Sequence, residues 1–200
     1  MDDINFTPVG RELMLDPDKV MISKLTPEGQ IDFVNDYFVE ITGYEVHEIV
    51  GKTFEDSKHA DVPMTIFNLM MDHLSDNKNL HIVLKDQAKD GRYYWYITDF
   101  ETKLDKEGNK ISTSSKRVAA PRSVIPEFDK LYKKILKIEQ NTSLETAKIY
   151  FDGFLEEKGM SFNDYTLHQI DSYTIHQGLS SSQSPQTKTK KSIMGKLFGK

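Results

Sequence analysis

Apolar and polar positions alternate in two short stretches near the start of the chain. Residues 20–25 read VMISKL and residues 31–34 read IDFV, with the sequence TPEGQ between them. Alternation with a period of two is typical of a strand, and Pro27 and Gly29 favour a tight turn. The pattern predicts a β-hairpin.

The next stretch, NDYFVEITGYEVHEIVG at residues 35–51, is too short and too broken at its central glycine to form one long helix. We expect two short helical pieces bent around Gly43, with Asn35 capping the first. A longer helix is predicted from Pro63 to about residue 75, because proline is favoured in a first helical turn and apolar residues recur at helical spacing after it.

Two further strands are predicted in residues 80–100, LHIVLKDQAKDGRYYWYITDF, with a turn at Asp90 and Gly91 of the kind common in hairpins. The sequence DKEGNK marks the next turn, and a third strand ends before Pro121. Strands on both sides of a helical segment indicate an α+β fold with an antiparallel sheet of five strands.

Three helices are predicted after the sheet, and a polar sequence typical of a flexible linker, GLSSSQSPQTKTKK, follows them. The predicted helices cover residues 124–140, 143–159 and 161–176. The chain therefore divides into an N-terminal extension, a central α+β domain, a helical signalling extension and a linker with a basic tail. These parts are residues 1–18, 19–120, 121–178 and 179–200.

Composition excludes several functional classes. The 200 residues contain no cysteine, which excludes disulfides, thiolate metal sites and a cysteine nucleophile. No apolar run approaches the roughly 18–20 residues of a membrane span, and the acidic N-terminus lacks the order of a secretory signal. These features predict a cytoplasmic protein. No phosphate-binding glycine loop or nucleophile motif is present, so we expect no enzymatic activity.

Charge is unevenly distributed along the chain. The whole chain carries a net charge of −5, but its last fifteen residues hold five lysines and no acid, so residues 1–185 carry about −10. An acidic body does not suit nucleic acid. The tail has a basic amphipathic pattern, which predicts contact with the inner face of the membrane or with a groove on a partner protein. The alternative is that the tail is a solvated chain end. Its apolar residues are Ile193, Met194, Leu197 and Phe198.

The order of these elements and two of the sequences resemble PAS domains. The sequence FVNDYFVEITGYEVHEIVGKTF, residues 33–54, is similar to the PAS core motif, in which an asparagine caps the first short helix. The sequence KDGRYYWYITDF, residues 89–100, is similar to the turn and aromatic strand of that family. The resemblance covers about residues 15–120 and implies the PAS fold, a five-stranded antiparallel sheet with short helices on one face, here followed by C-terminal helices.

Within PAS domains, the chain resembles the sensor module of bacterial aerotaxis and energy-taxis receptors, through KHADVPMTIFNLMM at residues 58–71 and VIPEFDKLYKKI at residues 124–135. In that group FAD lies in the PAS cavity, and a chemoreceptor-like partner is implied. The resemblance implies a set of cofactor-binding positions: Asn35, Lys58, His59, Asp61, Phe67, Met71, Leu80 and Asp86.

Several of these positions depart from the pattern of that group. Lys58 replaces an arginine and lacks its bidentate fork. Met71 and Leu80 replace tryptophans, which removes flat surfaces on which a flavin ring stacks. Asp86 replaces an asparagine, and an ionised carboxylate only accepts hydrogen bonds. The resemblance therefore supports a sensory role more strongly than it supports FAD.

Haem is the alternative cofactor, because some PAS domains bind it through a histidine on the long helix. His73 lies at helical spacing from Ile66 and Met70, near the apolar side, where an imidazole can reach an iron. The alternative is a solvated residue near the end of the helix. His59 is interpreted either as a loop histidine bonded to Asp61 or backbone, or as a residue at the mouth of the cavity.

We therefore expect a cytoplasmic PAS sensory protein that responds to redox or energy status through a bound cofactor. It would signal by contact with a chemoreceptor-like protein and form homodimers or contacts between PAS domains, with Trp95 and its tyrosine neighbours either packing the sheet or forming an outer docking face. The main alternative is a PAS domain without a cofactor that acts as a dimerisation or adaptor module. A third alternative is a PAS domain that binds a small metabolite.

Overall fold

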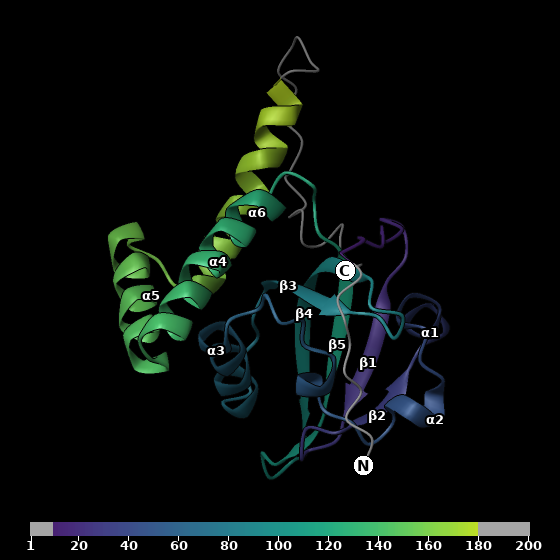
Figure 1. The fold of residues 1–200 in the computed structure, drawn as a ribbon. Coiled ribbons are helices and arrows are strands. Elements are labelled where there is room, and N and C mark those ends of the chain that lie inside the picture. Colours follow the sequence, from purple (N-terminus) through teal and green to yellow (C-terminus); the bar gives the residue numbers. More distant parts are fainter. Residues whose placement is uncertain (1–9, 180–200) are drawn as a thin grey trace.

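The computed structural model describes residues 10–179, and it has the expected α+β architecture (Figure 1). Five antiparallel strands form one sheet in the order β2-β1-β5-β4-β3. The strands are β1 (Met21–Leu25), β2 (Ile31–Val34), β3 (Ile82–Gln87), β4 (Tyr93–Leu104) and β5 (Lys110–Ala119). The helices between β2 and β3 are α1 (Asp36–Thr42), α2 (Val46–Ile49), the 3-10 helix η1 (Phe54–Ser57) and α3 (Met64–Ser75).

Asn35 fixes the first helix to the sheet, as the sequence predicts for a cap. Its Oδ1 accepts hydrogen bonds from the backbone N–H of Phe38 at 3.1 Å and of Ile22 at 3.0 Å. Its Nδ2 donates to the carbonyl oxygen of Val20 at 2.9 Å. Helix α1 ends at Gly43, whose φ of 70° lies in the left-handed region that glycine adopts without strain.

The two faces of the sheet are covered by different parts of the chain. On the inner face, the side chains of Tyr94 and Tyr96 are buried beneath the helices that follow β2. Trp95 points to the outer face, because side chains alternate along a strand, and its ring stacks on Tyr132 of the helical extension at a centroid distance of 6.4 Å. This part of the outer face is therefore covered by the chain's own helix rather than free for a second PAS domain.

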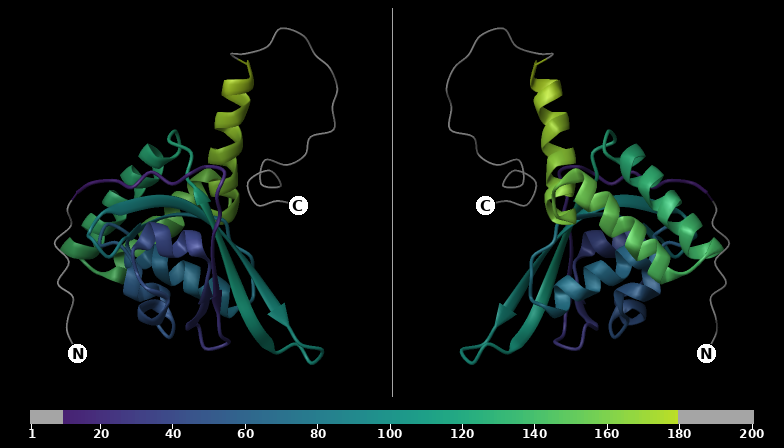
Figure 2. Two further views of the ribbon diagram at one scale, coloured as in Figure 1. Left: turned by 90° about the vertical axis from the view of Figure 1, so that its right-hand side faces the viewer. Right: turned by 90° about the vertical axis from the view of Figure 1, so that its left-hand side faces the viewer.

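The helical extension comprises three helices that pack on one another and on the β3 side of the sheet (Figures 1 and 2). They are α4 (Ile125–Asn141), α5 (Leu144–Lys158) and α6 (Phe162–Leu179). Aromatic rings form the contact between them, with centroids 5.1 Å apart for Phe151 and Phe162 and 5.8 Å apart for Phe128 and Tyr165. Figure 2 shows α6 projecting away from the end of the molecule that carries the β4–β5 turn.

Within residues 10–179 no helix is long and apolar enough to cross a membrane. Among the side chains that the structure describes, which end at residue 171, no three histidine or acidic groups are placed to hold a metal ion. The predicted linker and basic tail, beyond residue 179, lie outside the described residues.

Candidate functional site: the central cavity and its links to the helical extension

The inner face of the sheet and α3 enclose a small central cavity of about 10 Å³. Its walls combine apolar and aromatic side chains with three charged groups. The lining residues come from η1, the segment before α3, α3 itself and strands β3, β4 and β5: Phe54, Lys58, Val62, Phe67, Met70, Leu84, Asp86, Tyr96, Phe100 and Arg117.

A buried ion pair occupies the centre of this region. Nη1 of Arg117 on β5 donates to Oδ2 of Asp86 on β3 at 2.8 Å, and the side chains are 2% and 8% exposed. The hydroxyl of Tyr96, on the strand between them, donates to the same carboxylate oxygen at 2.9 Å. The pair therefore joins three strands across the inner face of the sheet.

Aromatic rings enclose the Arg117 guanidinium. Its central carbon lies 4.8 Å from the ring centroids of Phe54 and Tyr96 and 5.4 Å from that of Phe38. A cation over aromatic faces is stabilised by the ring quadrupoles, most strongly where water is excluded. Arg117 is thus held by one carboxylate, by ring faces and by a weaker contact of Nε with the Ser115 hydroxyl at 3.4 Å.

Burial is the largest single influence on the pKa of each charged residue that lines the cavity. It raises the pKa of Asp86, although the Arg117 guanidinium and the Tyr96 hydroxyl oppose this shift. Burial also acts to lower the pKa of Arg117, but the Tyr96 and Asp86 oxygens outweigh it and raise that pKa. The pKa of Lys58 is lowered by burial, with Glu139, Glu55 and Asp86 opposing the shift. Arg117 therefore stays charged, and it requires a partner.

His59 and Asp61 form a second polar cluster with Lys85, and none of the three lines the cavity. Nδ1 of His59 accepts a hydrogen bond from the backbone N–H of Asp61 at 3.0 Å. Lys85 forms an ion pair with Asp61 and lies 4.1 Å from the ring centroid of Tyr93. Burial, reinforced by Lys85, lowers the pKa of His59 to about 4, so the imidazole is neutral near pH 7.

The structure brings together only some of the predicted cofactor positions. Lys58, Phe67 and Asp86 line the cavity. Asn35 is a helix cap, as described above, and Leu80 is fully buried just before β3 without lining the cavity. Met71 faces away from the cavity into a groove between α3 and α5.

Arg117 was missed by sequence reasoning, although a signal for it exists. It lies two residues after Ser115 and four after Thr113, so all three share the inner face of β5. A charge at that register requires a counter-charge, and Asp86 is the acid opposite it. The register of Arg117 and the presence of Asp86 must be considered together to recognise the pair, because a lone arginine near a strand end is usually solvent-exposed.

A flavin ring does not fit this cavity as it is arranged. Ligand-binding pockets generally enclose about 300–1,000 Å³, whereas the space here is about 10 Å³. The side chains of Asp86 and Arg117 and the surrounding aromatic rings fill the space that a ligand would need. Haem fits no better, since His73 does not line the cavity and its Nδ1 lies 2.9 Å from the carbonyl oxygen of Leu69 in its own helix.

A carboxylate of the helical extension caps α3, the helix that forms one wall of the cavity. Pro63 precedes this helix and has no side-chain acceptor for its first N–H groups. Glu139 of α4 takes that role. Its Oε1 accepts from the backbone N–H and the hydroxyl of Thr65, both at 2.7 Å, and its Oε2 accepts from the N–H of Met64 at 3.1 Å.

A second contact joins α4 to the edge strand of the sheet. The hydroxyl of Tyr132 donates to the carbonyl oxygen of Val83 at 2.5 Å, and both residues are buried. At the start of the same strand, Oδ1 of Asn163 in α6 accepts from the backbone N–H of His81 at 2.9 Å. The extension therefore satisfies backbone groups of an edge strand that would otherwise be unpaired.

Comparisons with known proteins agree with this architecture. Residues 31–115 match the family model described as the PAS fold. The chain is 26% identical over 142 residues to the aerotaxis receptor of Escherichia coli (strain K12), a match that covers 71% of this chain. The chain spans only 27% of the length of that receptor.

Solved structures with PAS and light-oxygen-voltage domains are also similar. A light-oxygen-voltage domain studied with a flavin analogue has a TM-score of 0.49 and 20% identity, over 56% of this chain and 83% of that one. The PAS domain of the fruit-fly ELK potassium channel has a TM-score of 0.46 and 17% identity, over 50% of this chain and 85% of that domain's chain. From its sheet order and the family match, the chain carries a PAS-fold domain that resembles the PAS modules of aerotaxis receptors.

Proposed function

We propose that this chain is a non-enzymatic sensory protein in which the state of the PAS cavity is passed to the helical extension and from there to a protein partner. The observation that carries the proposal is the pair of contacts made by α4. Glu139 caps the cavity helix α3, and Tyr132 holds the edge strand β3. A change in either element alters the contacts of α4 directly.

Lys58 lies on the route between the cavity and α4. Lys58 lines the cavity, and its Nζ donates to the carbonyl oxygen of Val62 at 3.0 Å, just before α3 begins. The carboxylates of Asp86 in the cavity and of Glu139 on α4 both favour its charged form. A ligand or redox change that adds negative charge inside the cavity would draw Lys58 inwards and weaken its attraction to Glu139.

Transmission of this kind needs two arrangements of similar free energy. A stimulus shifts such an equilibrium only by the difference between its interactions with the two states, and gaps of a few kcal/mol are typical. The Glu139 cap is suitable because charge-assisted hydrogen bonds to a helix N-terminus contribute about 0.5–2 kcal/mol. Its loss would bias the position of α4 without unfolding the domain.

The partner we propose is a chemoreceptor-like signalling protein, on the strength of the likeness to the aerotaxis receptor. The proposed location is the cytoplasm, at the inner face of the membrane. The acidic body, with a net charge of about −10 over residues 1–185, suits contact with protein rather than with nucleic acid.

The single tryptophan gives a direct test, since Trp95 stacks on Tyr132 of α4 and reports how that helix sits on the sheet. We expect Lys58→Met to shift the Trp95 emission of the full chain. The matched control Lys24→Met replaces an exposed lysine on β1 and should leave the emission unchanged. An unchanged spectrum for Lys58→Met would contradict the proposed route.

A second candidate function is a PAS adaptor without a cofactor, and the small cavity volume favours it. In that case the Asp86–Arg117 pair takes the place that a ligand has in other PAS domains. The visible absorption spectrum of the purified full chain, before and after addition of FAD or haem, separates the candidates. Flavin or Soret bands would show that the cavity opens to a cofactor, and a colourless protein that takes up neither would favour the adaptor.

A further inference from the structure

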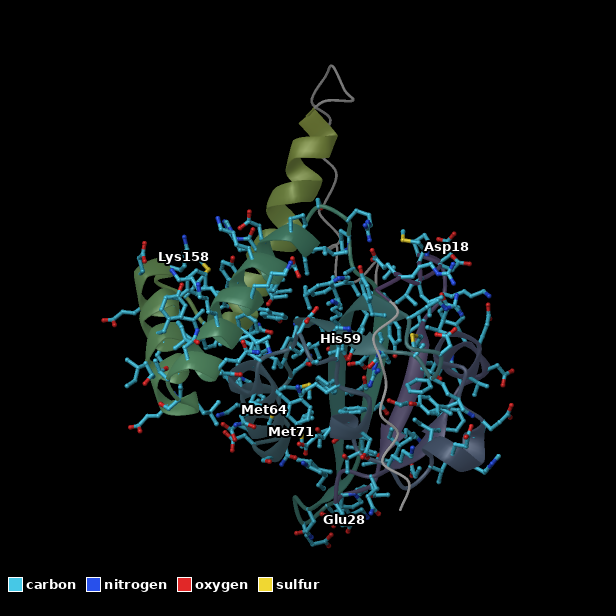
Figure 3. The ribbon with its side chains drawn as sticks, in the orientation of Figure 1. Asp18, Glu28, His59, Met64, Met71 and Lys158 are labelled. Atoms are coloured by element: carbon cyan, nitrogen blue, oxygen red, sulfur yellow. The ribbon has the colours of Figure 1, made fainter. Side chains whose placement is uncertain are left out.

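A groove lies between α3 and α5, on the side of α3 that faces away from the cavity. It encloses about 470 Å³, and ten residues line it, five from each helix. Figure 3 labels one of them, Met71 of α3. The lining residues are Thr65, Asn68, Leu69, Met71, Asp72, Leu144, Glu145, Lys148, Phe151 and Asp152.

The groove combines an apolar floor with an acidic rim. Leu69, Met71 and Phe151 are buried or half-buried, and Leu144 is an exposed leucine at the start of α5, with 43% of its surface accessible. The rim carries three exposed acidic side chains and one lysine. That lysine, Lys148, is already paired with one of the acids, Asp152. The groove therefore suits an occupant that is both apolar and basic.

The chain itself contains a segment with this chemistry. Residues 190–200, KKSIMGKLFGK, hold four lysines and no acidic residue. Four large apolar residues lie among them: Ile193, Met194, Leu197 and Phe198. Their spacing places them in two adjacent pairs four residues apart, the pattern of segments that insert apolar side chains into a groove on a folded protein.

The connecting chain is long enough for the segment to reach the groove. Helix α6 begins at Phe162, whose ring centroid lies 5.1 Å from that of the groove residue Phe151. Its 18 residues span about 27 Å, so its end lies within roughly 35 Å of Phe151. The thirteen residues 180–192 extend up to about 43 Å.

We propose that residues 190–200 bind in the α3–α5 groove of the same chain. The apolar residues cover the groove floor, and the lysines meet the acidic rim. Because Met71 and Leu69 belong to the helix that also forms the cavity wall, the bound tail holds α3 from its outer side. The tail would then act as an internal ligand of the signalling extension, which a partner must displace to reach the groove.

The absence of cysteine in the chain allows a clean test by disulfide crosslinking of the full-length protein. Ser192→Cys places a thiol at the start of the apolar segment, and Asn68→Cys places one on the groove rim. The control pairs Ser192→Cys with Glu157→Cys, an exposed α5 position that does not line the groove. Rates of disulfide formation under mild oxidation are followed by gel mobility and mass spectrometry.

We expect the groove pair to form an intramolecular disulfide roughly ten-fold faster than the control pair, because binding raises the local concentration of one thiol near the other. Adding Leu197→Asp should reduce the groove rate to that of the control. Equal rates for the two pairs would overturn the proposal, and so would disulfides found only between two chains. Equal rates together with binding of the chain to vesicles of anionic phospholipid would assign the tail to the membrane instead.

Discussion

The central cavity and the α3–α5 groove lie on opposite sides of α3 and differ in how they are filled. The cavity is small, at about 10 Å³, and the ion pair of Asp86 and Arg117 lines it. The groove is open, at about 470 Å³, and its floor is apolar. In the cavity the charges of Asp86 and Arg117 pair with each other, whereas the groove leaves apolar side chains uncovered. The two sides of α3 are therefore suited to different kinds of contact.

Helix α3 contributes residues to both regions. Phe67 and Met70 face the cavity, while Leu69 and Met71 face the groove. The N-terminus of the helix is held by Glu139 of α4. In the function that we propose, a stimulus on either side would act on this one helix and would change the contact of its N-terminus with Glu139 of α4.

The largest expected effect is on the buried ion pair. Either Asp86→Leu or Arg117→Met alone leaves one buried group without its partner, and we expect a loss of about 3–5 kcal/mol in the free energy of unfolding. The double variant removes both charges and should recover most of that loss. Urea unfolding of the four proteins measures the coupling, and additive losses in the double variant would mean that the two residues do not act as a pair.

Substitution of two adjacent methionines compares how tightly the cavity and the groove are packed. Met70 is 2% exposed and lines the cavity, whereas Met71 is half-buried and lines the groove. Met70→Ala should cost about 2–5 kcal/mol, because a cavity remains in a packed core. Met71→Ala should cost about 1 kcal/mol or less. Thermal or urea unfolding checks this, and equal costs would show that the groove is packed in solution.

His59, which lines neither the cavity nor the groove, makes the free energy of unfolding depend on pH. Its pKa is about 4 in the folded chain, against 6.5 as the ordinary value, because of burial and the nearby Lys85. The unfolded chain therefore binds more protons between these values. The His59 contribution, up to about 3 kcal/mol, is fully present above pH 6.5 and is lost as the pH falls towards 4.

The control for this prediction is His59→Gln, which removes the titrating group and keeps a polar side chain. Free energies of unfolding of both proteins are measured between pH 7 and pH 4. The difference between the two curves isolates His59 from the carboxylates that titrate in the same range. A constant difference would show that His59 titrates normally in the folded state.

The Glu139 cap should give the smallest change in stability and a localised change in dynamics. Glu139→Ala leaves the N–H groups of Met64 and Thr65 without acceptors, at a cost of about 0.5–2 kcal/mol. Hydrogen exchange should accelerate in the first turn of α3. Glu139→Gln keeps an acceptor and should have a weaker effect, so equal acceleration in both variants would point to the charge rather than the hydrogen bonds.

Much of the fold could be predicted from the sequence because the local signals agree with one another. The alternation in residues 20–25 and 31–34, the cap at Asn35 and the proline before α3 each have a local cause. The predicted helix over residues 124–140 appears as α4, Ile125–Asn141. The division into four parts remains a prediction, and its last part lies outside the described residues.

The site was harder to predict because its geometry is not local. Asp86 and Arg117 are 31 positions apart in sequence and meet only because β4 separates their strands. Glu139 caps a helix 74 residues earlier in the sequence, and no local pattern around Glu139 or Thr65 predicts that contact. Met71 was assigned to the cavity by resemblance, and helical periodicity alone did not decide which side of α3 it would occupy.

Hydrogen exchange on the full chain tests whether the cavity is coupled through α3 to α4. The cavity is altered by the charge-compensated double variant Asp86→Leu and Arg117→Met. We predict changed exchange in the first turn of α3 and along α4, with the β4–β5 turn unaffected, and loss of the α4 response when Glu139→Ala is added. Changes confined to β3, β4 and β5, with α4 unchanged, would mean that the cavity is not coupled to α4.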